Sequence, residues 1–414
     1  MIQQNLSSET NIKLPFSFIF FSLLALIISQ IILLGDGKLM VQGSFENPAI
    51  WSAAHFLILG WALMIAMGAM YQLVPVAFLT KIWNERFGFV QFFTMAIGVI
   101  SFAAMLYWSP QKAFIPGIIA LIGILMFLLQ MFMTLKKQAK PTILTAFVGS
   151  ALVSLLVTIF LGLNLIYFFK TGMGGESHEA IFKSHMLMGI TGWFTLLIFG
   201  FSYKMVPMFS LSHGFSMIQA RYVYGFYVSG LLVTLAALFS GSPILLKLGF
   251  FLMLLGFTTF SWHVKIILKK RLKKKLDKPF RFSIAAIGFG NVIHLLAFLL
   301  LWTNYVSDFL GPLIYAYLML WIVLSILGYL YKIVPFLWWT HKYSSNIGKK
   351  SVPTLKEMIN EKTILPLFGV FIGSAILVFF ALSLKLSLLF TIGQIIIAVV
   401  FITMALNIIS VIKK

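Results

Sequence analysis

Three of the seven histidines fall inside long apolar stretches of the sequence, at positions 55, 185 and 294. His55 and His185 each begin an H-x-L segment near the start of such a stretch, in AHFLILGW and SHMLMGITGW, and His294 lies near the middle of another. A neutral imidazole is a good ligand for haem iron, copper or non-haem iron. The pattern therefore favours a haem or metal role for His55 and His185 and suggests one for His294. A histidine that is hydrogen-bonded within a helix bundle is the alternative for each.

The other chemistry-bearing residues limit what such a site could be. The chain has no cysteine, which excludes disulfides, thiolate metal sites, iron–sulfur clusters and a covalently attached c-type haem. All ten Asp and Glu residues fall in predicted loops or tails, whereas proton relays and many cation-coupled transporters place such groups inside membrane helices. His178 lies in a predicted outer loop with Glu176 and Glu179, seven residues before His185. This segment is either an outer metal site or a solvated loop.

The elements that must hold the histidines are membrane helices. The chain has 414 residues, of which 61% are hydrophobic and 10% are charged, against roughly 25% charged residues in an average soluble domain. This composition predicts an all-α integral membrane protein, a single polytopic domain over residues 1–414 whose partner is the lipid bilayer. The first apolar run is too long for a secretory signal, so it counts as a membrane helix. Twelve runs result, at 14–34, 53–79, 88–107, 113–135, 142–169, 181–206, 221–239, 244–264, 282–302, 311–335, 363–384 and 387–411.

The basic residues predict the orientation of these helices. A formal net charge of +21 is typical of nucleic-acid-binding proteins. The positions of the charges along the chain indicate membrane topology instead. With both termini on the cytoplasmic side, 25 of the 31 Lys and Arg residues fall on inner segments, as expected for a multi-pass protein of the cell membrane. The segment KIILKKRLKKKLDKPFR at 265–281 is the strongest inner marker. It is either a plain topology signal or a binding site for anionic lipids.

A short motif recurs three times along the chain. Tyr71, Tyr203 and Tyr331 each begin the pattern Y-[QK]-x-V-P, and a tryptophan lies ten residues before each of them. The motifs are spaced by about four helices, so the chain is predicted to form three pseudo-symmetric four-helix units, over approximately 14–135, 142–268 and 282–411. Each motif proline should terminate or kink the inner end of its helix. The motif tyrosines and lysines should lie at the membrane interface.

Twelve helices in three four-helix units resemble the catalytic subunit I of the haem–copper oxidase superfamily, which comprises the cytochrome c and quinol oxidases of the respiratory chain and the bacterial nitric oxide reductases. In that fold, helices 2 and 10 supply histidines to the low-spin haem, and helix 10 also holds the high-spin haem. Helices 6 and 7 supply histidines to copper or non-haem iron. The resemblance implies that His55 is a haem ligand and that His185 is a ligand of the second metal.

The chain departs from that family on helices 7 and 10. Tyr315-Ala316-Tyr317 stands where helix 10 should carry an H-x-H pair, and the helix 7 stretch has no histidine. A complete oxygen-reducing centre is therefore not expected. Because tyrosinate can bind haem iron, Tyr315 or Tyr317 could replace the missing ligand opposite His55. The NnrS-like proteins, which have twelve helices, haem and copper and an association with nitric oxide stress, are similar to this chain in type.

These observations leave three hypotheses for the function. The first is a haem-binding protein that transfers electrons or handles a diatomic gas such as O2 or NO, as an oxidoreductase or with an electron donor or another membrane subunit as its partner. The second is a non-catalytic accessory, assembly or sensing protein on the same scaffold. The third is a small-molecule transporter, which the missing membrane carboxylates and the parallel arrangement of the repeats disfavour.

Overall fold

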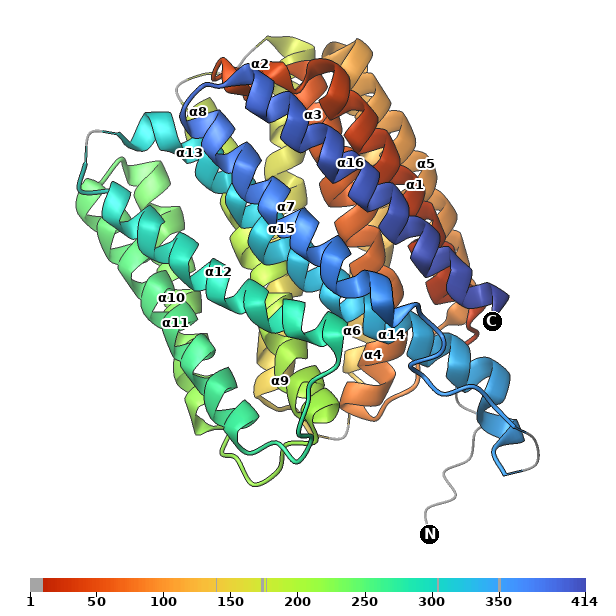
Figure 1. Ribbon diagram of the computed structural model, residues 1–414. Coiled ribbons are helices and arrows are strands. Elements are labelled where there is room, and N and C mark those ends of the chain that lie inside the picture. The colour runs from red at the N-terminus through yellow and green to blue at the C-terminus, as the bar shows by residue number, and fades with distance from the viewer. Residues whose placement is uncertain (1–9, 139, 173–174, 176, 304, 349–350) are drawn as a thin grey trace.

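The structure is a computed structural model, and it describes residues 10–138, 140–172, 175, 177–303, 305–348 and 351–414. The described part is 84% helical and has no strands. Twelve of its helices are long and apolar enough to cross a membrane, and they run side by side in one bundle (Figure 1). The twelve runs predicted from the sequence are confirmed: the spans are Lys13–Asp36, Pro48–Phe78, Glu85–Trp108, Phe114–Leu135, Ile143–Thr171, His178–Ser210, Ile218–Ser240, Pro243–Lys269, Lys278–Leu300, Val306–Asn346, Glu361–Ser383 and Ser387–Lys413.

Nine of these spans are formed chiefly by one α-helix each. They are α1 (Lys13–Asp36), α5 (Glu85–Trp108), α6 (Phe114–Leu135), α7 (Ile143–Thr171), α10 (Ile218–Ser240), α11 (Pro243–Lys269), α12 (Lys278–Leu300), α15 (Glu361–Ser383) and α16 (Ser387–Ser410). Short pieces accompany them: α2 (Lys38–Val41) and the 3₁₀ turns η3 (Pro110–Lys112) and η7 (Val411–Lys413). The first and last spans are neighbours (Figure 1), and Gln394 on α16 donates a 2.8 Å hydrogen bond to Gln30 on α1.

The second, sixth and tenth spans form the interior of the bundle. Between 72% and 83% of each is buried, against 28–44% of the other nine. Each contains a π-helical segment between two α-helices: α3 (Pro48–His55), η2 (Phe56–Leu63) and α4 (Met64–Phe78); α8 (His178–Met186), η4 (Leu187–Thr195) and α9 (Leu196–Ser210); α13 (Val306–Ala316), η5 (Tyr317–Val323) and α14 (Leu324–Tyr343), which the turn η6 (Ser344–Asn346) follows. The three π-segments carry the repeated tryptophans, Trp61, Trp193 and Trp321, which are all fully buried. A π-turn inside an α-helix is rare and often marks a functional site.

The motif prolines end two of the three inner spans. The helices end three residues after Pro75 and Pro207, and the next residues, Leu79 and Leu211, both adopt the left-handed conformation with φ of 51° and 53°. A non-glycine residue with positive φ is uncommon, and here it acts as the helix C-cap. The prediction of a helix end is thus confirmed for two motifs. After Pro335 the helix continues to Tyr343.

The motif tyrosines do not line the membrane interface as predicted. Tyr71, Tyr203 and Tyr331 are at most 4% exposed, and their hydroxyls form contacts inside the bundle, with Gln91, His263 and the carbonyl of Met404 respectively. Lys332 does not extend freely to water either, because its ammonium pairs with Asp277. The expectation of an aromatic belt was wrong because it used depth alone: these tyrosines lie on the innermost helices, where depth in the membrane does not imply contact with its surface.

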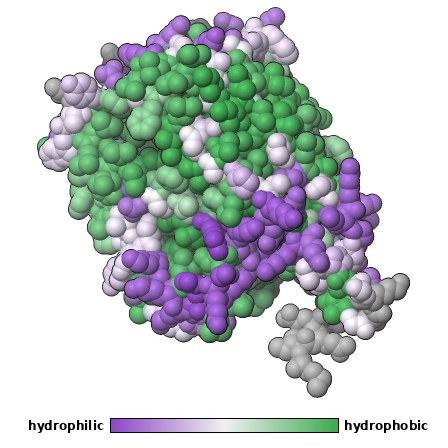
Figure 2. Space-filling view, viewed as in Figure 1, coloured by the Kyte–Doolittle hydropathy of each residue, from purple (hydrophilic) through white to green (hydrophobic). Residues whose placement is uncertain are grey.

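The carboxylates lie where the sequence predicted. Every described Asp and Glu is in a loop or at a helix end, and Glu9 and Glu176 lie outside the described residues. The face of the bundle seen in Figure 2 is a broad apolar surface, and hydrophilic side chains gather towards its ends. That surface fits a lipid bilayer as the surrounding medium.

Candidate functional site

The structure brings His55 and His185 together. His55 is the last residue of α3, and His185 lies near the end of α8, so each imidazole stands at the start of a π-segment. The two ring centroids are 6.4 Å apart, and the ring planes differ by 27°. Both side chains are only partly buried although they belong to the innermost spans. We call these two residues the histidine pair.

Each imidazole of the histidine pair is held through its Nδ1 atom. Nδ1 of His55 lies 2.7 Å from the carbonyl oxygen of Trp51, one turn earlier in the same helix. Nδ1 of His185 lies 2.9 Å from the carbonyl oxygen of Thr158 on α7. A carbonyl only accepts, so both rings carry their proton on Nδ1 and expose the lone pair of Nε2. Neither Nε2 has a hydrogen-bond partner among the described residues.

The surroundings of the pair fix the ring positions further. The Phe102 ring stands edge-on to His55, with centroids 5.2 Å apart. The His185 ring packs against Gly162 of α7, where an added Cβ would lie 2.9 Å from its Cε1 atom. Glycine at this position therefore lets the ring approach the helix closely. Metal-binding histidines usually donate the N–H of the ring nitrogen that does not bind the metal to a carbonyl or carboxylate, which fixes the ring. His55 and His185 are held in this way by a hydrogen bond at Nδ1 and by packing.

The spacing of the pair suits a shared metal ion. An imidazole nitrogen binds a metal at about 2.0–2.1 Å, and the ring centroid lies about 1 Å behind it, so two imidazoles on opposite sides of one ion have centroids roughly 6 Å apart. The measured separation is 6.4 Å. No group of three or more His, Cys, Asp or Glu side chains that could hold a metal occurs in the described part of the chain. A two-imidazole set suits a haem iron, whose remaining ligands come from the porphyrin, or a two-coordinate copper ion.

His294 belongs to a different site. Its Nδ1 atom lies 2.7 Å from the carbonyl oxygen of Gly290, and its Nε2 atom lies 3.4 Å from the Tyr227 hydroxyl. That hydroxyl is 3.3 Å from the Tyr317 hydroxyl, which is 2.7 Å from Oγ1 of Thr195. Trp321 Nε1 also donates to Thr195, at 3.1 Å. These residues form the tyrosine network: His294, Tyr227, Tyr317, Thr195 and Trp321. It joins α10, α12, η4 and η5, and all its side chains are buried.

The two tyrosines predicted as haem ligands therefore have different environments. The Tyr317 hydroxyl is engaged in the tyrosine network. The Tyr315 hydroxyl is buried and has no hydrogen-bond partner among the described residues. Tyr315 also stands six residues before Trp321, as His55 does before Trp61. A role of Tyr315 as a ligand opposite His55 stays a prediction.

Sequence reasoning missed several polar residues of the interior. The Nε1 atoms of Trp61 and Trp193 are buried and have no partner in the described part of the chain, like the hydroxyl of Tyr315. All three groups belong to the innermost spans. A buried donor without a protein partner is usually satisfied by a water, an ion or a cofactor. Tyr227 and Thr195 were also missed. The signal for Tyr227 was a phenol in the middle of a membrane helix, where an unpaired hydroxyl is costly.

The outer group around His178 stays a prediction. Helix α8 begins at His178, so His178 and His185 lie on one helix. Glu179 pairs with Lys183 in the same helix, and Nδ1 of His185 is bonded to the Thr158 carbonyl. His178 packs against Phe168, and its Nδ1 atom is buried without a partner among the described residues. Glu176 lies outside the described residues, and both interpretations of this segment, an outer metal site and a solvated loop, stay predictions.

Comparison of the chain with protein-family models and with curated proteins finds no match. The chemistry must therefore be argued from the site itself.

Proposed function

We propose that this protein is a haem-binding membrane protein of the haem–copper oxidase subunit I type, which transfers electrons or handles a diatomic gas such as O2 or NO. The observation that carries the proposal is the histidine pair. Two imidazoles from different inner spans approach each other at the separation of shared metal ligands, and each leaves its Nε2 lone pair free. Among the described residues, the two buried histidines, His263 and His294, instead engage both nitrogens.

His55 and His185 would hold one metal between them through their Nε2 atoms, either the iron of a haem or a copper or non-haem iron ion. This arrangement differs from the resemblance, which implies a separate metal for each of the two histidines. Such a metal would supply one-electron chemistry or a coordination site for a small gas. The orphaned donors Trp61 Nε1, Trp193 Nε1 and Tyr315 Oη are the groups that would bond polar substituents or ordered water beside it. The apolar helices around the site would exclude bulk water and so help set the potential of the metal.

The arrangement of the chain in the membrane is part of this proposal. The three innermost spans repeat the same order of α-helix, π-segment with tryptophan, and α-helix with the YxxVP motif. This supports three pseudo-symmetric four-helix units. The basic segment 265–281 and the start of α1 at the same end of the bundle as the end of α16 (Figure 1) support cytoplasmic termini in the cell membrane.

The second candidate is a scaffold protein that senses or assembles without catalysis. A specific observation favours it: the helix 7 and helix 10 positions where the resemblance calls for metal ligands carry tyrosines, and two of these are tied into the hydrogen-bonded tyrosine network. Under this candidate the chain binds haem or a metal without turning over a substrate, or uses another subunit as its partner.

The test is the reduced-minus-oxidised visible spectrum of the full-length protein, purified in mild detergent after expression with added haem precursor, together with metal analysis. We expect a Soret band with stoichiometric iron, or stoichiometric copper without a Soret band. His55→Ala and His185→Ala should each remove that metal. The matched control is His213→Ala, because His213 is an exposed loop histidine. A protein with neither haem nor metal would refute the proposal.

The same preparation separates the two candidates. A gas-handling or electron-transferring protein should be re-oxidised by O2 or NO, with a change in the visible spectrum within the time of mixing. Reduced, metal-loaded protein that neither binds nor is oxidised by these gases, and that accepts no electrons from quinols or small reductants, supports the non-catalytic candidate.

A further inference from the structure

A pocket of about 330 Å³ opens where three spans end or begin beside α14. Its walls come from the end of α9, the start of α12, the middle of α14 around Pro335 and the start of α15, with the segment 355–359 beside it. The spans of α9, α12 and α15 end or begin within a few residues of the pocket, at Ser210, Lys278 and Glu361. The pocket therefore lies at the level where the apolar part of the bilayer gives way to its headgroups.

The pocket has an apolar wall that is open to its surroundings. Met208, Leu211 and Phe336 line it and are 41%, 52% and 47% exposed. Leu211 is the residue that ends α9 in the left-handed conformation, which places it at the pocket. At this depth such side chains face the beginning of the lipid acyl chains.

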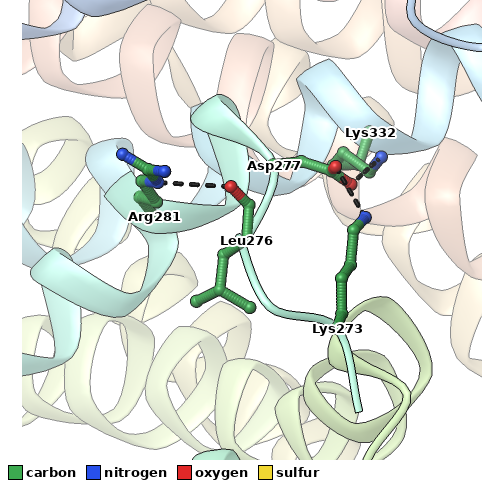
Figure 3. A network of polar contacts seen from close by, with 5 residues as sticks. All are labelled: Lys273, Leu276, Asp277, Arg281 and Lys332. Carbon is green, nitrogen blue, oxygen red and sulfur yellow. Dashed lines mark hydrogen bonds and ion pairs between the residues drawn. The ribbon is translucent and has the colours of Figure 1, made fainter. Parts of the chain in front are cut away.

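The polar wall of the pocket is basic. Lys273, Lys332 and Lys356 line it, against the carboxylates of Asp277 and Glu361. Figure 3 shows two of the lysines converging on Asp277 from different elements: Nζ of Lys273 lies 2.6 Å from Oδ1 and Nζ of Lys332 lies 2.5 Å from Oδ2. The adjoining segment 265–281 carries nine basic side chains and Asp277 as its one acidic residue.

Asp277 positions the ammonium groups of the two lysines without using all of their hydrogen-bond donors. Each ammonium group has three N–H donors and donates one of them to the carboxylate. The remaining donors of two ammonium groups, held close together by a shared carboxylate, can bind the oxygens of a phosphate. Lys356, from the segment 355–359, adds a third ammonium group to the lining of the pocket.

We propose that this pocket binds an anionic phospholipid, with the phosphate on Lys273, Lys332 and Lys356 and the first part of an acyl chain against Met208, Leu211 and Phe336. An amphiphile satisfies both walls at once, whereas a free phosphate would leave the apolar wall uncovered. Basic pockets between membrane helices at this level are typical sites for acidic lipid headgroups. The proposal does not depend on the histidine pair: His185 lies near the start of the sixth span, and the pocket lies at the other end of that span.

The experiment is native mass spectrometry of the full-length protein in detergent, titrated with phosphatidylglycerol or phosphatidylcholine of identical acyl chains. We expect one phosphatidylglycerol to bind at least about fivefold more tightly than phosphatidylcholine. The double variant Lys332→Ala/Lys356→Ala should lose about fivefold in affinity for each lysine removed. Lys273 still pairs with Asp277 in this variant, so the carboxylate is not left alone.

The control is Lys274→Ala/Lys275→Ala, which removes the same charge from two exposed positions next to the pocket. It should bind phosphatidylglycerol as the wild type does. Equal losses in both double variants would show that the whole basic segment attracts lipid and would overturn the proposal, as would a wild type without preference for phosphatidylglycerol. Inorganic phosphate that competes at the affinity of the lipid would also overturn it, because the acyl chain would then add nothing. Lys332→Arg/Lys356→Arg should retain binding, which separates lost charge from lost folding.

Discussion

The histidine pair and the tyrosine network lie in the same bundle and differ at the second nitrogen of the imidazole. In both regions Nδ1 is bonded to a backbone carbonyl. In the network, Nε2 of His294 faces the Tyr227 hydroxyl, while in the pair neither Nε2 atom has a partner among the described residues. The pair is also only partly buried, whereas the network is buried. An imidazole with a free lone pair can accept a metal without giving up a contact, and this property sets the pair apart as the proposed ligands.

The largest effect is expected when one imidazole is removed from each region. His185→Ala should abolish stoichiometric metal or haem binding, because one of two protein ligands is lost, whereas His294→Ala should leave metal content unchanged. Metal analysis and the visible spectrum of both purified variants check this. If His294→Ala lost the metal and His185→Ala kept it, the roles assigned to the two regions would be reversed.

The second prediction concerns the cost of opening the tyrosine network. Tyr317→Phe leaves the Thr195 and Tyr227 hydroxyls without one partner each inside an apolar bundle. Loss of a buried hydrogen bond with an orphaned partner costs about 1–3 kcal/mol. The midpoint of thermal unfolding in detergent should fall accordingly, with metal content unchanged. Tyr222→Phe, at an exposed position of α10, is the control and should unfold as the wild type does.

Substitution of Gly162 should alter the histidine pair without replacing either histidine. Gly162→Ala would place a Cβ 2.9 Å from Cε1 of His185, so the ring must shift from its hydrogen bond to Thr158. Affinity for the metal should fall by about tenfold, the usual effect of disturbing a ligand's support. Gly149→Ala is the matched control on the same helix, because its Cβ would meet nothing within 4 Å. Unchanged affinity in Gly162→Ala would mean that the position of the His185 ring does not matter.

The smallest effect on stability is expected at Asp277. This residue lies outside the histidine pair, the tyrosine network and the spans, so its substitution should leave metal content unchanged. Burial raises the pKa of its carboxyl, but the ammonium groups of Lys273 and Lys332 outweigh burial, and the pKa lies below its usual value. A lowered pKa means that the ionised carboxylate stabilises the fold above about pH 4, the usual carboxyl value, and that this contribution is lost as the pH falls through the lowered pKa.

Asp277→Asn should therefore reduce the free energy of unfolding by about 1 kcal/mol at neutral pH. The difference from the wild type should shrink at acid pH, as thermal unfolding at several pH values would measure. The metal content of the histidine pair should not change. A difference that grew with acidification would contradict the assigned sign.

The features that could be predicted from the sequence are those that each helix determines by itself, its position and its ends. Apolar length alone located all twelve spans, and Pro75 and Pro207 located two helix ends. Contacts between helices could not be predicted in the same way. His55 lies six residues before its tryptophan and His185 lies eight before its own, so sequence register alone does not place them side by side. The burial of Tyr71 and its equivalents follows from which helices are innermost, a property of the assembled bundle.

The π-segments let the innermost spans carry an extra residue without turning their two ends relative to each other. A π-turn accommodates one residue more than an α-turn, whereas one residue added to a regular α-helix turns everything beyond it by about 100°. Deleting a single residue from η2 would therefore restore the regular α-helical pitch there and leave α3 and α4 in nearly the same mutual orientation. His55 and the YxxVP end would keep their neighbours, while the side chains of η2, Trp61 among them, would change direction. A π-turn can thus re-aim the side chains inside it without disturbing the helix on either side, and all three innermost spans carry one at their repeated tryptophan.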